Sequence, residues 1–210
     1  MIILIGGEKG GTGKTTVSTN LAVAFIHNKL DFIIIDSDKQ ASFSDWATIR
    51  NEKMSEKIYC ISKYGDLRND IRGLSQKYQN IIIDIGGRDT MEFRTALTVC
   101  DCVYIPMLAS QFDMWTMGRI QNAINDAMPL NPKLKAILIL NRVPTNPQIQ
   151  EKDEVKALDG ELQNISIGNT LIYERIVYRK AAKDGLGVLE LDDKKAKIEI
   201  TNLYEEIMNG

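Results

Sequence analysis

Residues 6–16 decide the fold of this chain, and they read Gly6-Gly7-Glu8-Lys9-Gly10-Gly11-Thr12-Gly13-Lys14-Thr15-Thr16. The run follows an apolar, β-branched segment, Ile2–Ile5, and opens a helical pattern over Thr15–Asn28. A glycine-rich turn between a strand and a helix lets successive backbone N–H groups point inward, where they form a nest for an anion. The N-terminal end of the helix adds its positive dipole, so the stretch predicts a phosphate-binding loop.

The residues that close the loop have chemistry suited to a nucleoside triphosphate. Lys14 can reach the β- and γ-phosphates, and the hydroxyl of Thr15 is placed to ligate Mg²⁺. The residues expected to contact the nucleotide are Glu8, Lys9, Gly10, Gly11, Thr12, Gly13, Lys14, Thr15 and Thr16.

Acidic residues end two further apolar segments. Asp36 and Asp38 follow Ile33-Ile34-Ile35, and Asp84 follows Ile81-Ile82-Ile83. The side chains of Asp36 and Asp38 could lie on one side of an extended strand end. Near a triphosphate, one of these two acids would hold Mg²⁺ or its waters, and the other would position an attacking water. An alternative for Asp38 is a helix N-cap, because a helical pattern begins at Ser42.

The loop departs from the plain pattern G-x-x-x-x-G-K-[ST], because Glu8 stands where that pattern has glycine and a second lysine, Lys9, follows it. The run Lys9-Gly10-Gly11-Thr12-Gly13-Lys14-Thr15 resembles the deviant Walker A motif of the ParA/MinD family of P-loop ATPases. In that family the extra lysine reaches the nucleotide of the facing subunit. The resemblance therefore implies that ATP holds together a sandwich homodimer through Lys9.

The same resemblance gives roles to the acids. Asp36 to Ser42 looks like the family's first switch segment, with Asp38 as the residue that activates water, although Lys39 stands where the family usually has proline. Asp84 looks like a Walker B residue acting on Mg²⁺, so Thr15, Asp36 and Asp84 are the candidate metal residues. Lys9, Lys14 and Asp38 are the candidate catalytic residues, for hydrolysis of ATP to ADP and phosphate with slow turnover. Gly86-Gly87 would form the second switch.

Asn141 and Arg142 follow an apolar segment, Ala136–Leu140. By analogy with the family, Asn141 is expected to contact the adenine edge, and we place Arg142 with it at the nucleotide. The alternative is a turn residue.

The remainder of the chain predicts the fold class. Short β-rich runs without polar alternation suit strands buried on both faces, and they alternate with helical patterns. We expect one α/β P-loop domain over residues 1–210, with a twisted, mostly parallel sheet and helices on both faces. The expected strands are Ile2–Ile5, Phe32–Asp36, Ile81–Asp84, Val103–Pro106 and Ala136–Asn141. The expected helices are Thr15–Asn28, Ser42–Glu52, Asp66–Tyr78, Asp89–Val99 and Asp113–Ala127.

Composition excludes several classes of protein. The 210 residues are 44 % hydrophobic and 26 % charged, which is an ordinary globular balance. No apolar run approaches the ~20 residues that a membrane helix needs, and no basic segment precedes an apolar one at the start, so a cytoplasmic location is the default expectation. Three cysteines, a small and odd number, argue against a disulfide framework. The net charge of −2 means that any nucleic-acid affinity must come from a local patch.

Such a patch is predicted near the C-terminus. Residues 175–190 resemble the C-terminal block of small plasmid-partition ParA ATPases, a resemblance that extends over nearly the whole chain. On a helix, Arg175, Arg179 and Lys183 would share one face, with Lys180 beside them. This stripe could contact DNA phosphates without reading sequence; the alternative is an ordinary solvated helix face.

Two rival classes are weaker. A MinD-like membrane ATPase needs a basic amphipathic tail, but the spacing of Ala196, Ile200, Leu203 and Ile207 favours a packed closing helix with glutamates among its polar residues. An iron–sulfur carrier needs cysteine ligands, whereas Cys100 and Cys102 flank the start of a buried segment and are expected in the core.

The sequence therefore predicts an ATP-dependent DNA segregation ATPase. Mg-ATP would drive dimerisation and nonspecific DNA binding, and so nucleoid association, and hydrolysis would reset the protein. A ParB-type centromere-binding partner and no membrane contact are implied by the resemblance. The alternative is a MinD-like positioning ATPase for a membrane or protein cargo, without DNA binding.

Overall fold

The computed structural model describes the chain except for residues 88, 109–113, 147–152, 154 and 156–161. The strands are β1 (Ile2–Ile5), β2 (Phe32–Asp36), β3 (Cys60–Ser62), β4 (Asn80–Asp84), β5 (Cys102–Met107), β6 (Lys135–Val143) and β7 (Ser166–Tyr173). The helices are α1 (Lys14–His27), α2 (Ser42–Lys53), α3 (Arg68–Ser75), α4 (Met91–Leu97), α5 (Met114–Ala127), α7 (Ile176–Lys183) and α8 (Lys194–Asn209), with a 3₁₀ turn, η2 (Val188–Glu190).

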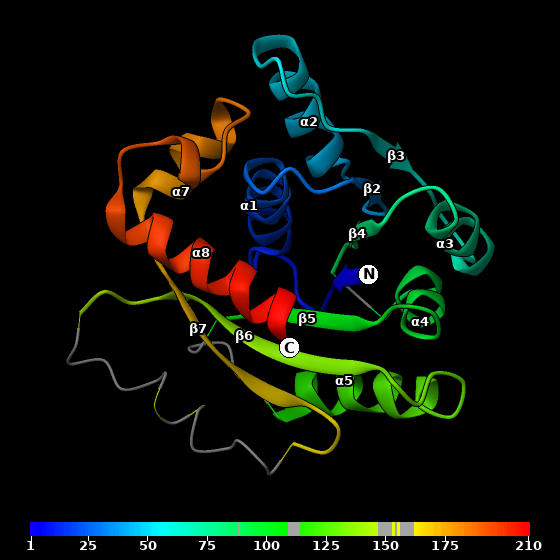
Figure 1. The fold of residues 1–210 in the computed structure, drawn as a ribbon. Coiled ribbons are helices and arrows are strands. Elements are labelled where there is room, and N and C mark those ends of the chain that lie inside the picture. The colour runs from blue at the N-terminus through cyan, green and yellow to red at the C-terminus, as the bar shows by residue number, and fades with distance from the viewer. Residues whose placement is uncertain (88, 109–113, 147–152, 154, 156–161) are drawn as a thin grey trace.

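Within the described residues, the strands form one sheet in the order β3-β2-β4-β1-β5-β6-β7. Every neighbouring pair in this sheet is parallel. The expected α/β fold is confirmed, and the sheet is wholly rather than mostly parallel. β1 lies between β4 and β5, so its carboxyl end, where the glycine-rich loop begins, is near the middle of the sheet (Figure 1).

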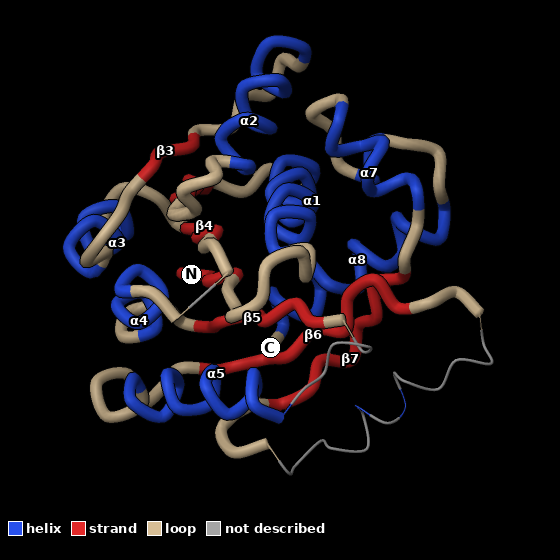
Figure 2. The backbone as a smooth tube through the Cα atoms, turned by 180° about the vertical axis from the view of Figure 1, so that it is seen from behind, coloured by secondary structure: helices blue, strands red, loops and turns tan. Residues whose placement is uncertain are grey.

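The two faces of the sheet are covered by different helices. Successive strand residues point to opposite faces, so Leu4 packs with α3, α4 and α5, whereas Ile3 and Ile5 pack with α1, α2, α7 and α8. Figure 2 shows the same two groups of helices from behind. Burial on both faces explains why these strands lack polar alternation.

The edge strand β7 is tied to α8 by carboxylates. Glu206 accepts hydrogen bonds from the backbone N–H groups of Asn169 and Thr170, both at 2.9 Å. Glu199 accepts one from the N–H of Tyr173 at 3.2 Å. The apolar side of α8 is buried in the core at Ala196, Ile200, Leu203 and Ile207, which confirms the expected packed closing helix.

The sequence reasoning missed two strands, β3 and β7, and placed some helix ends too far out. The predicted Asp66–Tyr78 and Asp89–Val99 are α3 (Arg68–Ser75) and α4 (Met91–Leu97). The predicted helix at Asp113 begins outside the described residues, which resume at Met114. Cys100 and Cys102 are buried and reduced, as expected.

Candidate functional site: a phosphate loop beside two strand-end carboxylates

The glycine-rich loop reaches α1 through a residue that only glycine can occupy. Gly13 is the N-cap of α1, with φ of 91° in the left-handed region. A Cβ built on it would lie 2.0 Å from Nδ2 of Asn141. The same Nδ2 donates a hydrogen bond to the Thr12 carbonyl at 2.6 Å. Asn141, near the end of β6, therefore packs against the loop and is hydrogen-bonded to it.

Lys14 is held inside the loop. Its side chain is buried, with 6 % of the residue exposed, and Nζ donates to the Lys9 carbonyl at 2.8 Å. Burial lowers the pKa of Lys14, while the nearby Asp84 and Asp38 carboxylates oppose that shift. An ammonium that has already lost most of its water is suited to an anionic phosphate.

The strand register brings two carboxylates together at the candidate metal position. Asp36 and Asp84 are directly paired across β2 and β4, and both are buried. Thr15 Oγ1 donates to Asp84 Oδ2 at 2.9 Å, and Ser18 Oγ donates to Asp84 Oδ1 at 2.8 Å. These oxygens are the hard ligands that Mg²⁺ prefers, directly or through water, so Thr15, Asp36 and Asp84 fit the predicted metal role. Ser18 is a further site residue that the sequence reasoning missed, although it lies one turn after Lys14 on α1.

Two acids side by side are costly without a cation. Burial raises the pKa of Asp84 to about 7, and the neighbouring Asp36 adds to the rise, whereas hydrogen bonds from Ser18 and Thr15 oppose it. A divalent cation at this place would remove the repulsion between the two carboxylates.

Asp38 lies against the second glycine pair. A Cβ on Gly86 would be 3.1 Å from the Asp38 carboxylate, and a Cβ on Gly87 would be 2.7–2.8 Å from the Lys9–Gly10 peptide. Asp38 Oδ1 also accepts a hydrogen bond from Gln40 N at 2.9 Å. The two expected switch segments and the phosphate loop therefore touch one another through glycine backbone.

The phosphate loop, Asp38 and the glycines Gly86 and Gly87 line one cavity of about 870 Å³, within the range for small-molecule sites. It is lined by the phosphate loop and the switch segments, and also by Asn141, Arg142, Tyr173–Arg175, Tyr178 and Arg179. Asn141 and Arg142 thus lie where the sequence placed them. The amide nitrogen of Asn141 is engaged by Thr12, however, and Arg142 pairs with Glu174 at 2.9 Å. Contacts of Asn141 with the adenine base and of Arg142 with the nucleotide stay predictions.

The two residues before the glycine pair differ in their surroundings. Glu8 lines the cavity and pairs with Arg119 of α5, a partner that sequence reasoning missed. Lys9 is half-buried and, unlike its neighbours Glu8 and Gly10, is not among the described residues that line the cavity. The expected role of its amine at the nucleotide of a facing subunit stays a prediction.

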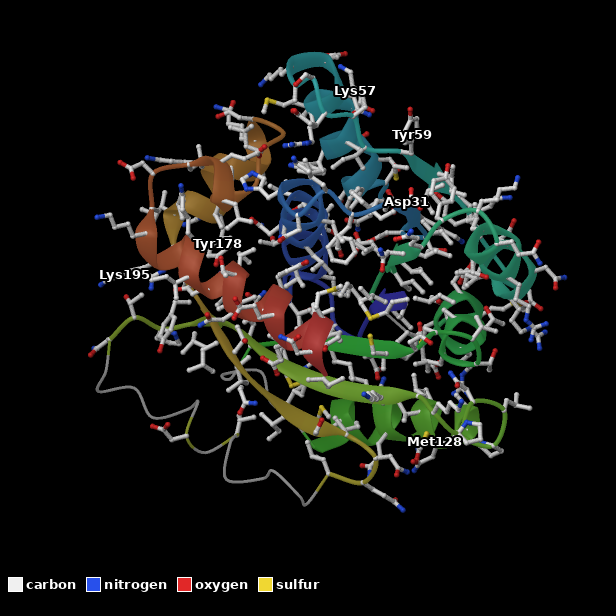
Figure 3. All side chains as sticks on the ribbon, in the orientation of Figure 1. Asp31, Lys57, Tyr59, Met128, Tyr178 and Lys195 are labelled. Carbon is white, nitrogen blue, oxygen red and sulfur yellow. The ribbon has the colours of Figure 1, made fainter. Side chains whose placement is uncertain are left out.

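The predicted basic stripe needs one correction. Arg175 is not in the helix but is the N-cap of α7, with extended backbone. Its guanidinium pairs with the buried Glu199 at 2.7 Å, and Tyr178, labelled in Figure 3, donates to the same carboxylate at 2.8 Å. The helical spacing failed here because α7 starts one residue later. Arg179, Lys180 and Lys183 are exposed on α7 as expected.

Among the described residues, no group of three or more His, Cys, Asp or Glu forms a metal cluster. No helix in the described part of the chain has both the length and the apolar character to cross a membrane.

A family model for the CobQ/CobB/MinD/ParA nucleotide-binding domain matches residues 3–188. The chain belongs to this family. A curated relative, the maintenance of carboxysome distribution protein A of Halothiobacillus neapolitanus, is 27 % identical and covers 98 % of this chain and 95 % of its own.

Solved structures of other family members show the same fold. A plasmid partition protein of Borrelia burgdorferi B31 bound to AMPPNP has a TM-score of 0.75 at 20 % identity, covering 99 % of this chain and 98 % of its own. The septum site-determining protein MinD of Pyrococcus horikoshii, complexed with Mg-ADP, has a TM-score of 0.70 at 18 % identity, covering 98 % and 95 %. The expected membership of the ParA/MinD family and its P-loop fold are confirmed.

Proposed function

We propose that this chain is an ATP-dependent DNA segregation ATPase, in which Mg-ATP drives homodimerisation and nonspecific DNA binding and hydrolysis reverses both. The observation that carries the proposal is the shared cavity. Its lining includes the phosphate loop and Asp38 together with Arg179 of the basic helix α7. A nucleotide in this cavity would touch the helix proposed to bind DNA.

The chemistry at the phosphate end is in-line hydrolysis. The loop N–H groups and Lys14 would hold the triphosphate, with Thr15, Asp36 and Asp84 around the metal. Mg²⁺ would neutralise charge on the phosphate oxygens. Asp38 would orient the attacking water, and its contact with Gly86 would let the position of the second switch govern this orientation. Lys9 of the facing subunit would complete the charge, so turnover would be slow in the monomer.

The basic end supplies the link to DNA. Arg179, Lys180 and Lys183 offer three cations on a short helix, so each protomer makes few phosphate contacts and dimerisation doubles them. Binding should therefore be weak, independent of sequence and dependent on ATP. A ParB-type centromere-binding protein that stimulates hydrolysis, and nucleoid association of the ATP form, complete the proposal.

The test measures retention of the ATP-analogue form on DNA of arbitrary sequence over a series of salt concentrations. Wild type should bind, and its affinity should fall steeply with salt, whereas R179E/K183E should bind at least tenfold more weakly with a shallower slope. K77E/K133E, which changes the net charge equally at exposed lysines away from α7, is the matched control. Equal loss in both variants, or none, would contradict the assignment of α7.

A second candidate is a positioning ATPase for a protein or membrane cargo. The relative named for carboxysome distribution favours it. Under this candidate, ATP would still produce a dimer, but the dimer would show no salt-dependent retention on DNA. The same measurement on the wild-type protein thus separates the two functions.

A further inference from the structure

The helix α2 starts at the candidate metal site. Asp36 Oδ2 accepts hydrogen bonds from both the backbone N–H of Ser44, at 2.9 Å, and its hydroxyl, at 2.7 Å. Ser44 is in the first turn of α2, and Asp36 Oδ1 accepts from the N–H of Asp38 at 3.1 Å. One buried carboxylate therefore fixes both the first switch and the start of this helix.

The same helix is fastened further along to the segment that follows α7. Arg50 is fully buried and forms a two-pronged ion pair with Glu190, with both N···O distances at 2.8 Å. Its Nη1 also donates to the Gly185 carbonyl at 3.2 Å. One turn earlier, Trp46 Nε1 donates to the Leu186 carbonyl at 3.3 Å. Figure 1 shows α2 above α1 and α7 to the left of the upper part of α1.

The segment after α7 is packed so closely against α2 and α1 that side chains would not fit at two of its glycines. Gly185 has φ of 72°, and a Cβ on it would lie 2.6 Å from the Arg50 backbone nitrogen. A Cβ on Gly187 would lie 2.8 Å from Val23 of α1. Glu190 Oε2 also accepts a hydrogen bond from the Gly187 N–H at 2.9 Å. Residues 185–190 are therefore packed tightly against both α2 and α1.

We propose that α2 is a rigid connector between the metal-site carboxylate and the basic helix α7, and that Arg50 is the positioning residue that joins the two. The inference rests on the proposed function, because it concerns how the nucleotide controls the DNA-binding helix. When Asp36 gains a cation, its hydrogen bonds to Ser44 change, and α2 shifts as one body. Such small helix shifts are a usual means of conformational coupling.

The chemistry of the pair supports a positioning role. A buried ion pair adds little net stability compared with apolar side chains of similar size, because both charges lose their water. A two-pronged guanidinium–carboxylate pair does fix direction as well as distance. Arg50 thus fixes the distance and orientation of Glu190 relative to α2. Met or Leu at position 50 would fill the space without fixing this orientation.

The main experiment replaces the pair by apolar side chains of similar length, R50M/E190M. We expect this variant to fold, to bind an ATP analogue within about twofold of wild type, and to dimerise. The ratio of its DNA affinity with ATP analogue to that with ADP should fall at least about fivefold, the lower end of usual coupling. Arg94→Met, which removes an ion pair between α4 and α5 on the other face of the sheet, is the control. An unchanged ratio in R50M/E190M would overturn the proposal.

A second readout does not need DNA. In a Trp115→Phe background, Trp46 is the one tryptophan left, and its indole lies at the junction. An ATP analogue with Mg²⁺ should change its emission, and R50M/E190M should suppress that change. If Trp46 does not respond to nucleotide, the connector is disproved. If it responds while no form binds DNA, the proposed function fails and the connector stands.

Should R50M/E190M fail to fold, Glu190→Gln keeps the size of the side chain and removes only its charge. It should lower the same affinity ratio and weaken the Trp46 response in the same direction. A folded E190Q with wild-type values for both would overturn the role given to Arg50.

Discussion

The side-chain amide of Asn141 occupies the space that a side chain at position 13 would need. Its Nδ2 lies 2.6 Å from the Thr12 carbonyl and 2.0 Å from the place of a Cβ on Gly13. The end of β6 and the residue before α1 are therefore sterically complementary, because the Asn141 side chain fits only if position 13 is glycine. This contact helps to fix the position of the phosphate loop relative to β6.

Asn141→Asp tests this support with almost no change in shape. The new carboxylate oxygen would face the Thr12 carbonyl and could not donate, so the loop should be pushed from its present position. We expect ATP-analogue affinity to fall about tenfold or more. This is the cost of leaving two buried acceptor oxygens facing each other with no donor between them. Titration with a fluorescent ATP analogue measures it, with Asn125→Asp as control. Wild-type affinity in N141D would show that the hydrogen bond is dispensable.

Lys9→Ala should separate nucleotide binding from dimerisation. Lys9 does not line its own cavity among the described residues, so the variant should bind the ATP analogue with nearly wild-type affinity. It should stay monomeric, because the facing site would lose its second amine. Light scattering with and without the analogue measures the change, and Lys77→Ala is the control. A dimer of K9A at wild-type protein concentrations would refute the role in the facing site.

Asp38 and Gly86 should act together on hydrolysis. Asp38→Asn should bind ATP and dimerise, but its turnover should fall about 10²-fold or more, because the group that orients water is lost. Gly86→Ala would place a methyl group 3.1 Å from the Asp38 carboxylate and should slow turnover in the same direction. Phosphate release measures both. Gly118→Ala, where a Cβ has open space, is the control, and equal turnover in G86A and G118A would exclude the contact.

Asp84 should make the stability of the metal-free protein depend on pH. Its folded pKa of about 7 lies above the ordinary value of 3.8, so the folded state binds the proton more tightly than the unfolded chain. The stabilising contribution is complete below about pH 4 and is lost as the pH rises through about 7. Asp84→Asn resembles the protonated carboxyl at every pH.

Urea denaturation of the two proteins at about pH 5 and about pH 8 measures this effect. Wild type should lose stability relative to D84N as the pH rises, by an amount on the order of a few kcal/mol, and Mg²⁺ should restore part of it. A constant difference between D84N and wild type across this range would mean that Asp84 is ionised throughout.

Much of this site could be predicted from the sequence because the chemistry is local. The loop, the strand and the helix that position Lys14 and Thr15 are contiguous, and the two acids end strands whose apolar runs are unmistakable. Parallel strands put their carboxyl ends at one edge, so Asp36 and Asp84 had to meet near the loop.

The rest depends on contacts between distant segments. Cys60–Ser62 is too short to show a pattern, and Ser166–Tyr173 contains Gly168 and Asn169, which are unfavourable in strands. Helical spacing alone could not show that Arg175 precedes α7 and meets Glu199, 24 residues away. The partners of Glu8 and Arg50 lie 111 and 140 residues along the chain, beyond any local pattern.

Glu199 and Glu206 of α8 protect the edge strand β7 from pairing with another chain. An edge strand with free N–H groups is a template onto which a second sheet can grow. At Asn169, Thr170 and Tyr173, an incoming strand would first have to displace Glu206 or Glu199 from the N–H groups they already satisfy. Growth of the sheet through β7 into fibres is therefore discouraged at these three positions.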